Sequence, residues 1–247
     1  MTASTAALSR WGIHVPDVVY IVRKGDRNDE LRYSLRSLRN LPHGNVWIVG
    51  YRPEWVTGTH HLATIQAGTK RENGHQNLVT ASQCGDITEA FILMNDDFFV
   101  MHPIVRIPTL HRGTVDETIT EFTRKRRGNG SYVASMIQTR NVLQGLGYTK
   151  PLSYELHVPI VINRERFLEA VHLVAGLGGT ALNKRTVYGN VHNIGGDRIR
   201  DPKIATNWQQ WKATHPFLST SDHTFHTDRV GGHIRATFPD PSPYEKT

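Results

Sequence analysis

Two adjacent carboxylates follow a strongly apolar segment in "EAFILMNDDFFVMHP", residues 89–103. The apolar residues 91–94 predict a buried strand. Asp96 and Asp97 lose hydration beside such a core and repel each other, so they need a compensating cation or hydrogen-bond donors. Mg²⁺ and Mn²⁺ prefer carboxylate oxygens and bind substrate phosphates alongside one or two protein ligands. Asn95, Asp96 and Asp97 therefore predict a metal site, although Asp pairs also begin turns and cap helices.

The elements that must position this segment alternate between strand and helix over the first ninety residues. Apolar and β-branched runs predict strands at 17–22, 45–50, 61–67 and 90–95, and leucines at helical spacing predict a helix at 27–41 with Asp29 as its N-cap. A second helix is expected at 72–84. This pattern favours an α/β fold with a doubly wound parallel sheet, which binds ligands at the carboxyl ends of its strands. Asn95, Asp96 and Asp97, which we call the acidic segment, lie at such an end.

The second half is less regular. Helices are expected at 116–126 and 164–175, a buried strand at 157–163, and a glycine-rich break at 176–183. The basic run at 123–130 is interpreted as a helix end and loop, with a phosphate-binding or lid role as the alternative. No repeat or linker divides the chain, so one domain is expected over 1–247, with a frayed tail at 241–247.

Composition limits the function classes. The chain has 247 residues, 38% of them hydrophobic, and a net charge of +7, which implies anionic partners such as nucleic acid, phosphorylated metabolites or a membrane surface. A single cysteine, Cys84, allows no intrachain disulfide and favours a reducing compartment. No apolar stretch approaches the ~20 residues of a membrane span, and no signal peptide is evident. We therefore expect a soluble, cytoplasmic protein without a transmembrane segment.

The order of several motifs resembles a known family. Residues 17–56, "DVVYIVRKGDRNDELRYSLRSLRNLPHGNVWIVGYRPEWV", resemble the opening block of the Stealth family of hexose-1-phosphate transferases and their bacterial and phage-borne glycosyltransferase relatives. "NDD" follows in the family's order, "YELHVPIVINRERF" (154–167) resembles its His-x-Pro block, and "YGNVHNIGG" and "FLSTSDHTF" resemble its C-terminal part. The first strand ends in "IVRKGDRND" where Stealth proteins often have "WVDGSD".

This resemblance implies a GT-A-like, Rossmann-like fold with a nucleotide-binding half at 17–105 and an irregular acceptor-side half at 106–240. It implies a transferase that takes a nucleotide-diphosphate sugar as donor and uses Mn²⁺ or Mg²⁺. Relatives occur in capsule-synthesis loci and phage genomes, so the acceptor would be a polysaccharide or a protein, including a phage structural protein. A phage-encoded enzyme would act in the host cytoplasm.

Roles in the first half follow from the resemblance combined with chemistry. Asp97, with Asp96, would hold the cation. Arg32 and Arg36 lie four residues apart on one helix face, so both are candidates for phosphate contacts, or for ordinary ion pairs with Glu30 or Asp29. The remaining candidates for donor binding are Asp17, which begins the first strand, Arg23, Lys24 and Asp26 after it, Lys70, Arg71 and Asn73 after the third strand, and Asn95 and Asp96.

In the second half, His157 is the first candidate for an acid–base or phosphate-contacting residue, because it matches the His-x-Pro block and a neutral imidazole accepts a proton near physiological pH. Glu155, two residues earlier on the same side of an extended segment, is the alternative base. Asp222 is either a further metal ligand or a turn residue. His192, Asn193 and His223 are additional polar positions.

Three other functions compete with sugar transfer. Transfer of a hexose 1-phosphate would release a nucleoside monophosphate instead of a diphosphate. A nucleic-acid-binding protein would explain the charge, but the chain has no recognisable reading motif, and its aromatic residues do not interleave with Lys and Arg. A metal-dependent phosphoesterase would explain the carboxylates, yet such enzymes usually need several separated Asp or His ligands.

Overall fold

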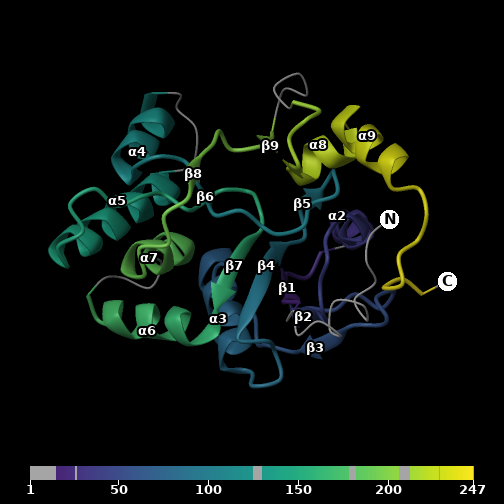
Figure 1. The fold of residues 1–247 in the computed structure, drawn as a ribbon, viewed down its shortest axis with the longest axis horizontal. Coiled ribbons are helices and arrows are strands. Elements are labelled where there is room, and N and C mark those ends of the chain that lie inside the picture. The colour runs from purple at the N-terminus through teal and green to yellow at the C-terminus, as the bar shows by residue number, and fades with distance from the viewer. Residues whose placement is uncertain are drawn as a thin grey trace.

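The centre of the molecule is a five-stranded mixed sheet (Figure 1). The computed structural model describes residues 15–25, 27–124, 130–177, 182–205, 212–227 and 229–246. The strands lie in the order β3-β2-β1-β4-β7. β1 (Asp17–Val22), β2 (Val46–Gly50), β3 (His60–Leu62) and β4 (Ala90–Asn95) are parallel, and β7 (Ile160–Asn163) pairs antiparallel with β4. The expected α/β class and mostly parallel sheet are confirmed.

Helices cover both faces of this sheet because its buried strands are apolar on both sides. On one face, Val18, Tyr20 and Val22 of β1 pack with the leucines of α2 (Asp29–Ser37) and of the short 3₁₀ helix η1 (Leu38–Asn40). On the other, Val19 packs with residues of α3 (Lys70–Gln83), α6 (Arg164–Val174) and α7 (Lys184–Val191). The sheet is thus the middle layer of three.

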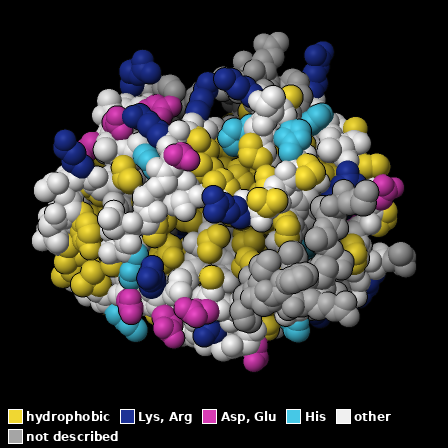
Figure 2. All heavy atoms as spheres, viewed as in Figure 1, with side chains coloured by type: hydrophobic (Ala, Val, Ile, Leu, Met, Phe, Trp, Pro, Cys, Tyr) yellow, Lys and Arg dark blue, Asp and Glu magenta, His cyan; other side chains and the backbone are white. Residues whose placement is uncertain are grey.

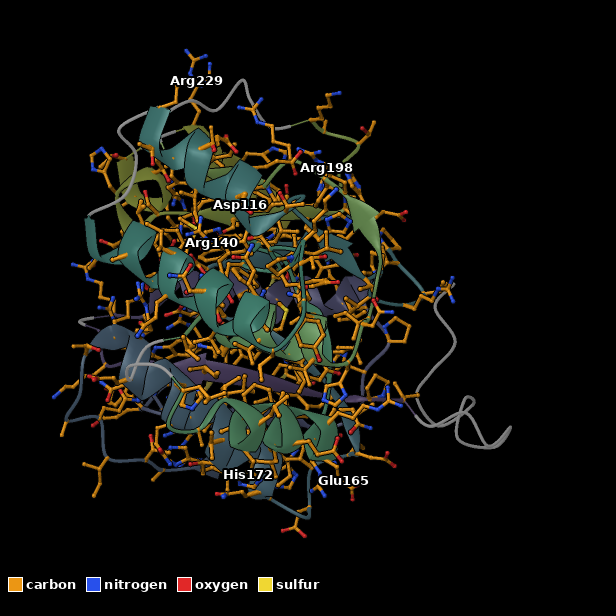
Figure 3. All side chains as sticks on the ribbon, turned by 90° about the vertical axis from the view of Figure 1, so that its left-hand side faces the viewer. Asp116, Arg140, Glu165, His172, Arg198 and Arg229 are labelled. Carbon is orange, nitrogen blue, oxygen red and sulfur yellow. The ribbon has the colours of Figure 1, made fainter. Side chains whose placement is uncertain are left out.

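Smaller elements surround the carboxyl ends of the strands. A three-stranded sheet joins β5 (Phe98–Val100), β10 (Phe217–Thr220) and β9 (Lys203–Ile204), and it packs against α8 (Asp222–Thr227) and α9 (Arg229–Thr237). β6 (Leu110–His111) pairs with β8 (Asp197–Arg198). α4 (Val115–Arg124) and α5 (Gly130–Gly145) lie together, and Arg140 of α5 bonds Asp116 of α4 at 2.8 Å (Figure 3).

The structure shifts several predicted boundaries. The third strand covers only 60–62, and the strand predicted from 157 begins at Ile160, so His157 precedes it in a loop. Asn28, with a φ of 53°, is the N-cap of α2 in place of Asp29. Helices α5, α7, α8 and α9 and the small sheet were not predicted, because polar or small residues interrupt their apolar periodicity. The basic run at 123–130 falls largely on 125–129, outside the described residues.

The prediction of a frayed tail is wrong. The backbone N–H of Thr57 donates to the carbonyl of Tyr244 at 3.0 Å, and that of Lys246 donates to Trp55 at 2.8 Å. Figure 1 shows the C-terminal segment descending from α9 past α2. Glu245, 6% exposed, supplies the counter-charge for two arginines of α2, which is why the segment is held in place.

Among the described helices, none combines the length and apolar character that crossing a bilayer requires. Figure 2 shows hydrophobic side chains gathered toward the middle of one face, with Lys and Arg side chains along its upper rim. The upper part of this view is the region of α4, α8 and β9, beyond the carboxyl ends of the parallel strands (Figure 1).

Candidate functional site

The acidic segment lies where the strand order reverses. Chain connections run from β1 outward to β2 and β3 and then return to β4 on the other side of β1. Ile21 of β1 is in register with Asn95 of β4, so Arg23 and Asp96 both follow the carboxyl ends of these two strands. In open α/β sheets this reversal leaves a crevice that binds ligands. The structure therefore brings Asn95, Asp96 and Asp97 to the expected edge.

Three carboxyl groups crowd this edge, with unequal compensation. Burial raises the pKa of Asp96 to about 6, and the neighbouring charge of Asp97 adds to the rise. Burial likewise raises the pKa of Glu30 to about 8, although a 2.6 Å hydrogen bond from Thr220 opposes the rise. Burial would also raise the pKa of Asp97, but Lys203, 2.9 Å away, and His157 lower it below its ordinary value. Asp96 and Glu30 thus receive weaker compensation than Asp97, which is the carboxylate that Lys203 pairs with directly.

A polar cavity of about 690 Å³ opens on one side of Asp96. Its wall includes Arg23 and Lys24 from the loop after β1, together with Glu30 and Asp222. Asn28 shapes this loop, since its amide donates to the carbonyl of Arg23 at 3.0 Å and its side-chain oxygen accepts from the Gly25 N–H at 3.3 Å. Cationic side chains and four carboxyl groups, those of Asp29, Glu30, Asp96 and Asp222, face a single space here. Hereafter we call it the switch-point cavity.

Another cavity, of about 570 Å³, opens between the acidic segment and the loop that precedes β7. We call it the β7-side cavity. The polar residues that line it and bear on its chemistry are Glu155, His157, Lys184, Arg185, Asp201 and Lys203, and Phe98, Phe122 and Tyr132 add aromatic walls. Lys203 contributes to this cavity while its ammonium bonds Asp97. The two cavities therefore border the same short acidic segment, with Asn95 lining the β7-side cavity and Asp96 the switch-point cavity.

His157 and Asp201 form a hydrogen-bonded pair in the β7-side cavity. Nδ1 of His157 lies 2.9 Å from Oδ2 of Asp201, and the His157 backbone N–H donates to Oδ1 at 3.2 Å. Arg112 also donates to Asp201, at 3.0 Å. Burial alone would raise the pKa of Asp201, but His157 and Arg112 hold it below its ordinary value. A carboxylate on Nδ1 fixes the proton there, so Nε2 of neutral His157 is left as a proton acceptor.

Glu155 has a different position from the one expected. Its Oε1 accepts from the backbone N–H of Arg185 at 3.0 Å and of Thr186 at 3.2 Å, in the first turn of α7. These bonds satisfy N–H groups that a helix leaves unpaired at its start. Glu155 therefore fastens the loop to α7, and His157 is the freer acid–base group.

A close contact between Tyr154 and Gly189 fixes how near the loop that carries Glu155 and His157 lies to α7. A methyl group built on Gly189 would lie 2.4 Å from the ring of Tyr154. The ring occupies the space that any larger residue in the helix would fill, and its hydroxyl donates to the carbonyl of Gly195 at 2.9 Å. The residue before Glu155 is thus fixed against α7 by shape.

Several predicted donor-binding residues lie elsewhere or have other partners. Asp17 is buried at the amino end of β1, away from the acidic segment, where it accepts bonds from Asn45 and Trp47. Arg32 and Arg36 each donate to Glu245 at 2.8 Å, so their ion-pair partner is Glu245 and not Glu30 or Asp29. Asp26 lies outside the described residues.

The residues after the third strand divide in the same way. Lys70 begins α3, and its charge lowers the pKa of both Asp96 and Asp97, which places it near the acidic segment. Asn73 exchanges two hydrogen bonds with Gly68 and shapes the loop before the helix. Arg71 lies 5.8 Å from the ring centre of Tyr132.

The remaining candidates are peripheral. Asp222 lines the switch-point cavity but is 88% exposed, and Nε2 of His226 lies 3.4 Å from its carboxyl oxygen. His192 contacts the carbonyl of Arg166, and His223 lies 3.3 Å from the hydroxyl of Thr227. Asn193 has a φ of 47°, so it serves a backbone turn.

The carboxyl groups at the switch-point cavity are oxygen ligands of the kind that a divalent cation prefers. Within the described residues, no three His, Cys, Asp or Glu side chains converge to form a metal site by themselves. Asp96 nevertheless offers a hard oxygen ligand, and burial together with the charge of Asp97 raises its pKa to about 6, so a cation beside it would be stabilising. Mg²⁺ is commonly bound by one or two carboxylates together with substrate phosphates and water. The residues fit a cation of this kind, with Asp96 as its main ligand and Asp222 within the same cavity.

Sequence reasoning missed Asp201, Lys203, Arg112, Lys184 and Arg185. These residues come from irregular segments, from the two-residue strand β9 and from α7. Their partners are distant in the chain; Lys203 and Asp97 are 106 residues apart. The signal that was available is charge itself, since a buried carboxylate pair requires basic partners somewhere in the chain. It does not say which of the 29 Lys and Arg residues those partners are.

Comparison of the sequence with protein-family models and with curated proteins gives no match.

Proposed function

We propose that this protein is a metal-dependent glycosyltransferase that moves a sugar from a nucleotide-diphosphate sugar to a hydroxyl group of a polysaccharide or protein acceptor. The observation that carries the proposal is the acidic segment at the strand-order reversal. It borders one cavity that holds Arg23 and Lys24 together with carboxyl groups, and a second cavity that holds a His–Asp pair. The motif order that resembles the Stealth family and its glycosyltransferase relatives agrees with it. The GT-A assignment is part of the same proposal.

The switch-point cavity suits the donor. Arg23 and Lys24 offer cationic contacts to a diphosphate, and the strand-order reversal is where α/β sheets bind nucleotides. A divalent cation held by Asp96 would neutralise the diphosphate and stabilise the leaving group. Lys70, close to both aspartates, would add a further positive charge beside the phosphates.

The β7-side cavity suits the acceptor. Nε2 of His157 takes the proton of the acceptor hydroxyl as its oxygen attacks the anomeric carbon. The bond between that carbon and the diphosphate oxygen breaks, and the nucleoside diphosphate leaves with the bonding electrons. Asp201 keeps the imidazole in the required tautomer and stabilises the imidazolium that forms.

Product analysis tests the proposal. The full chain is incubated with each common nucleotide sugar and Mn²⁺, and the released nucleotide is identified by chromatography. Nucleoside diphosphate is expected. Monophosphate without a diphosphate intermediate would instead mean hexose-1-phosphate transfer, because attack at phosphorus breaks a different bond. No release with any donor, together with thermal stabilisation by DNA alone, would favour a nucleic-acid-binding protein.

Two substitutions link turnover to the site. Asp96→Asn is expected to abolish turnover and the thermal stabilisation by Mn²⁺ plus nucleoside diphosphate. Asp86→Asn is the matched control, because Asp86 is exposed just before β4, at the opposite end of the strand from the site. Full activity of Asp96→Asn in the presence of chelator would falsify the metal-dependent mechanism.

A further inference from the structure

A buried guanidinium in the β7-side cavity lacks a partner for one of its nitrogens. Arg185 is 4% exposed, and its Nη1 donates to the carbonyls of Leu156 and Val158, both at 2.8 Å. Its Nη2 is buried and has no hydrogen-bond partner among the described residues. A buried donor left unsatisfied costs folding free energy, so a ligand atom that accepts a hydrogen bond from Nη2 would recover that free energy.

Lys184, the preceding residue, lines the same cavity. It forms no hydrogen bond or ion pair with a described residue, and burial lowers its pKa to about 8 although the charge of Glu155 opposes the shift. Two adjacent cationic side chains at the start of α7 thus face one space.

The other charges around this cavity already have partners. Lys203 is paired with Asp97, and Arg112 with Asp201. The carboxylate of Glu155 accepts from two backbone N–H groups. Of the four cations Lys184, Arg185, Lys203 and Arg112, the first two therefore form no ion pair with a described carboxylate. A ligand that carries a negative charge would match them.

We infer that the β7-side cavity binds an acceptor sugar that bears a phosphate or a carboxylate, and that Arg185 and Lys184 hold this anionic group. The inference rests on the proposed function, because the acceptor assignment uses His157 as the base in the same cavity. Nη2 of Arg185 donates to an oxygen of the anion, and the Lys184 ammonium supplies a second charge. Phe98, Phe122 and Tyr132 provide aromatic walls for the sugar ring.

Binding measured without turnover tests this inference. The probes are glucose, glucose 6-phosphate, glucuronate and inorganic phosphate, titrated calorimetrically into the full chain at fixed ionic strength. The two anionic sugars separate a phosphate from a carboxylate preference. At least one of them is expected to bind ten- to a hundredfold more tightly than glucose, and phosphate should compete with it.

Two variants assign the effect to the named residues. Lys184→Gln is expected to weaken the preferred anionic sugar about tenfold and to leave glucose unchanged. Arg185→Lys retains the charge but loses the forked donor, so it should weaken binding similarly. Because Arg185 also holds two backbone carbonyls, Lys184→Gln alone decides if Arg185→Lys does not fold. Lys150→Gln, at an exposed turn away from the cavity, is the control and should change nothing.

Equal affinity for glucose and both anionic sugars would overturn the inference, as would a charge preference that survives in Lys184→Gln. If that variant lost nucleoside diphosphate binding and kept acidic sugar binding, the cavity would be the binding site of the donor. This result would also overturn the inference. Release of nucleotide from a nucleotide sugar without acceptor tests the proposed function separately. That release can persist when anion binding fails, so the two failures are distinguishable.

Discussion

The ion pair between Lys203 and Asp97 should stabilise the fold, and Lys203→Met tests this. The Lys203 ammonium lies 2.9 Å from an Asp97 oxygen, and the two side chains are 25% and 16% exposed. Methionine keeps most of the side-chain volume and removes the charge. Asp97 is then left beside Asp96 without its nearest cation, so the free energy of unfolding should fall and the pKa of Asp97 should rise.

The size of the effect follows from the separation and the partial exposure of the pair. Two unit charges at 2.9 Å attract by about 6 kcal/mol at an effective dielectric constant of about 20, and by about 1.4 kcal/mol in bulk water. Desolvation of both groups offsets part of the larger figure. We therefore expect a coupling free energy of about 2 kcal/mol between the two residues.

A double-mutant cycle measures that coupling. Unfolding by urea at pH 7 is followed for the unmodified chain, Lys203→Met, Asp97→Asn and the double variant. Each single change should destabilise the protein, and the double variant should be more stable than the sum of the single effects predicts. Because Lys203→Met frees the carboxylate, Mn²⁺ should also raise its melting temperature more than that of the unmodified chain.

Additive single effects, with a coupling below about 0.5 kcal/mol, would refute the view that Lys203 compensates Asp97. An unchanged response to Mn²⁺ in Lys203→Met would refute the narrower idea that the lysine and a metal share the negative charge of the acidic segment. Lys150→Met controls for the general loss of a surface charge.

Three further predictions concern other parts of the molecule. Glu30 has a raised pKa of about 8, so its contribution to stability is lost as pH rises from about 4.5 through 8. Glu30→Gln should therefore raise the free energy of unfolding at pH 8 by about 1–3 kcal/mol and flatten its pH dependence. An unchanged midpoint of urea unfolding would contradict this. Glu245 has a pKa lowered to about 2, so its contribution to stability is present above about pH 4.5 and lost as pH falls toward 2. Glu245→Gln should lower the free energy of unfolding by about 2 kcal/mol at pH 7. The exposed control Glu165→Gln (Figure 3) should leave it unchanged. Asp201→Asn should lower kcat at least ~10²-fold with little change in KM and should alter the pH profile of kcat, because the His157 tautomer is no longer fixed; a pH profile identical to that of the unmodified chain would argue against this positioning role.

The central sheet could be predicted because its strands are short, continuous apolar runs. Residues 17–22 and 90–95 coincide with β1 and β4, and the parallel order then places residue 96 at the carboxyl edge without further information. Boundaries were less predictable where tertiary contacts decide them. The run from 61 to 67 contains polar residues that no neighbouring strand pairs with beyond Leu62, so only three residues form β3.

The site itself was only half predictable. Asp96, Asp97 and His157 belong to motifs that stand out locally, but their partners are set by long-range packing. Lys203 reaches Asp97 because β9 joins the small sheet through β10. The sequence around residue 203 contains no pattern that predicts this ion pair. The tail prediction failed for the same reason, since Glu245 is anchored by arginines more than 200 residues away.

The contact between Tyr154 and Gly189 implies a rule about which sequences can share this site. Because the ring fills the space of the missing methyl group, alanine at 189 is compatible with the present loop only if residue 154 becomes smaller. In related chains the two positions should therefore vary together, with glycine at 189 accompanying a large ring at 154. A chain that kept tyrosine at 154 and gained a side chain at 189 would have to move the loop that carries Glu155 and His157, and would differ in activity while conserving every polar residue of the site.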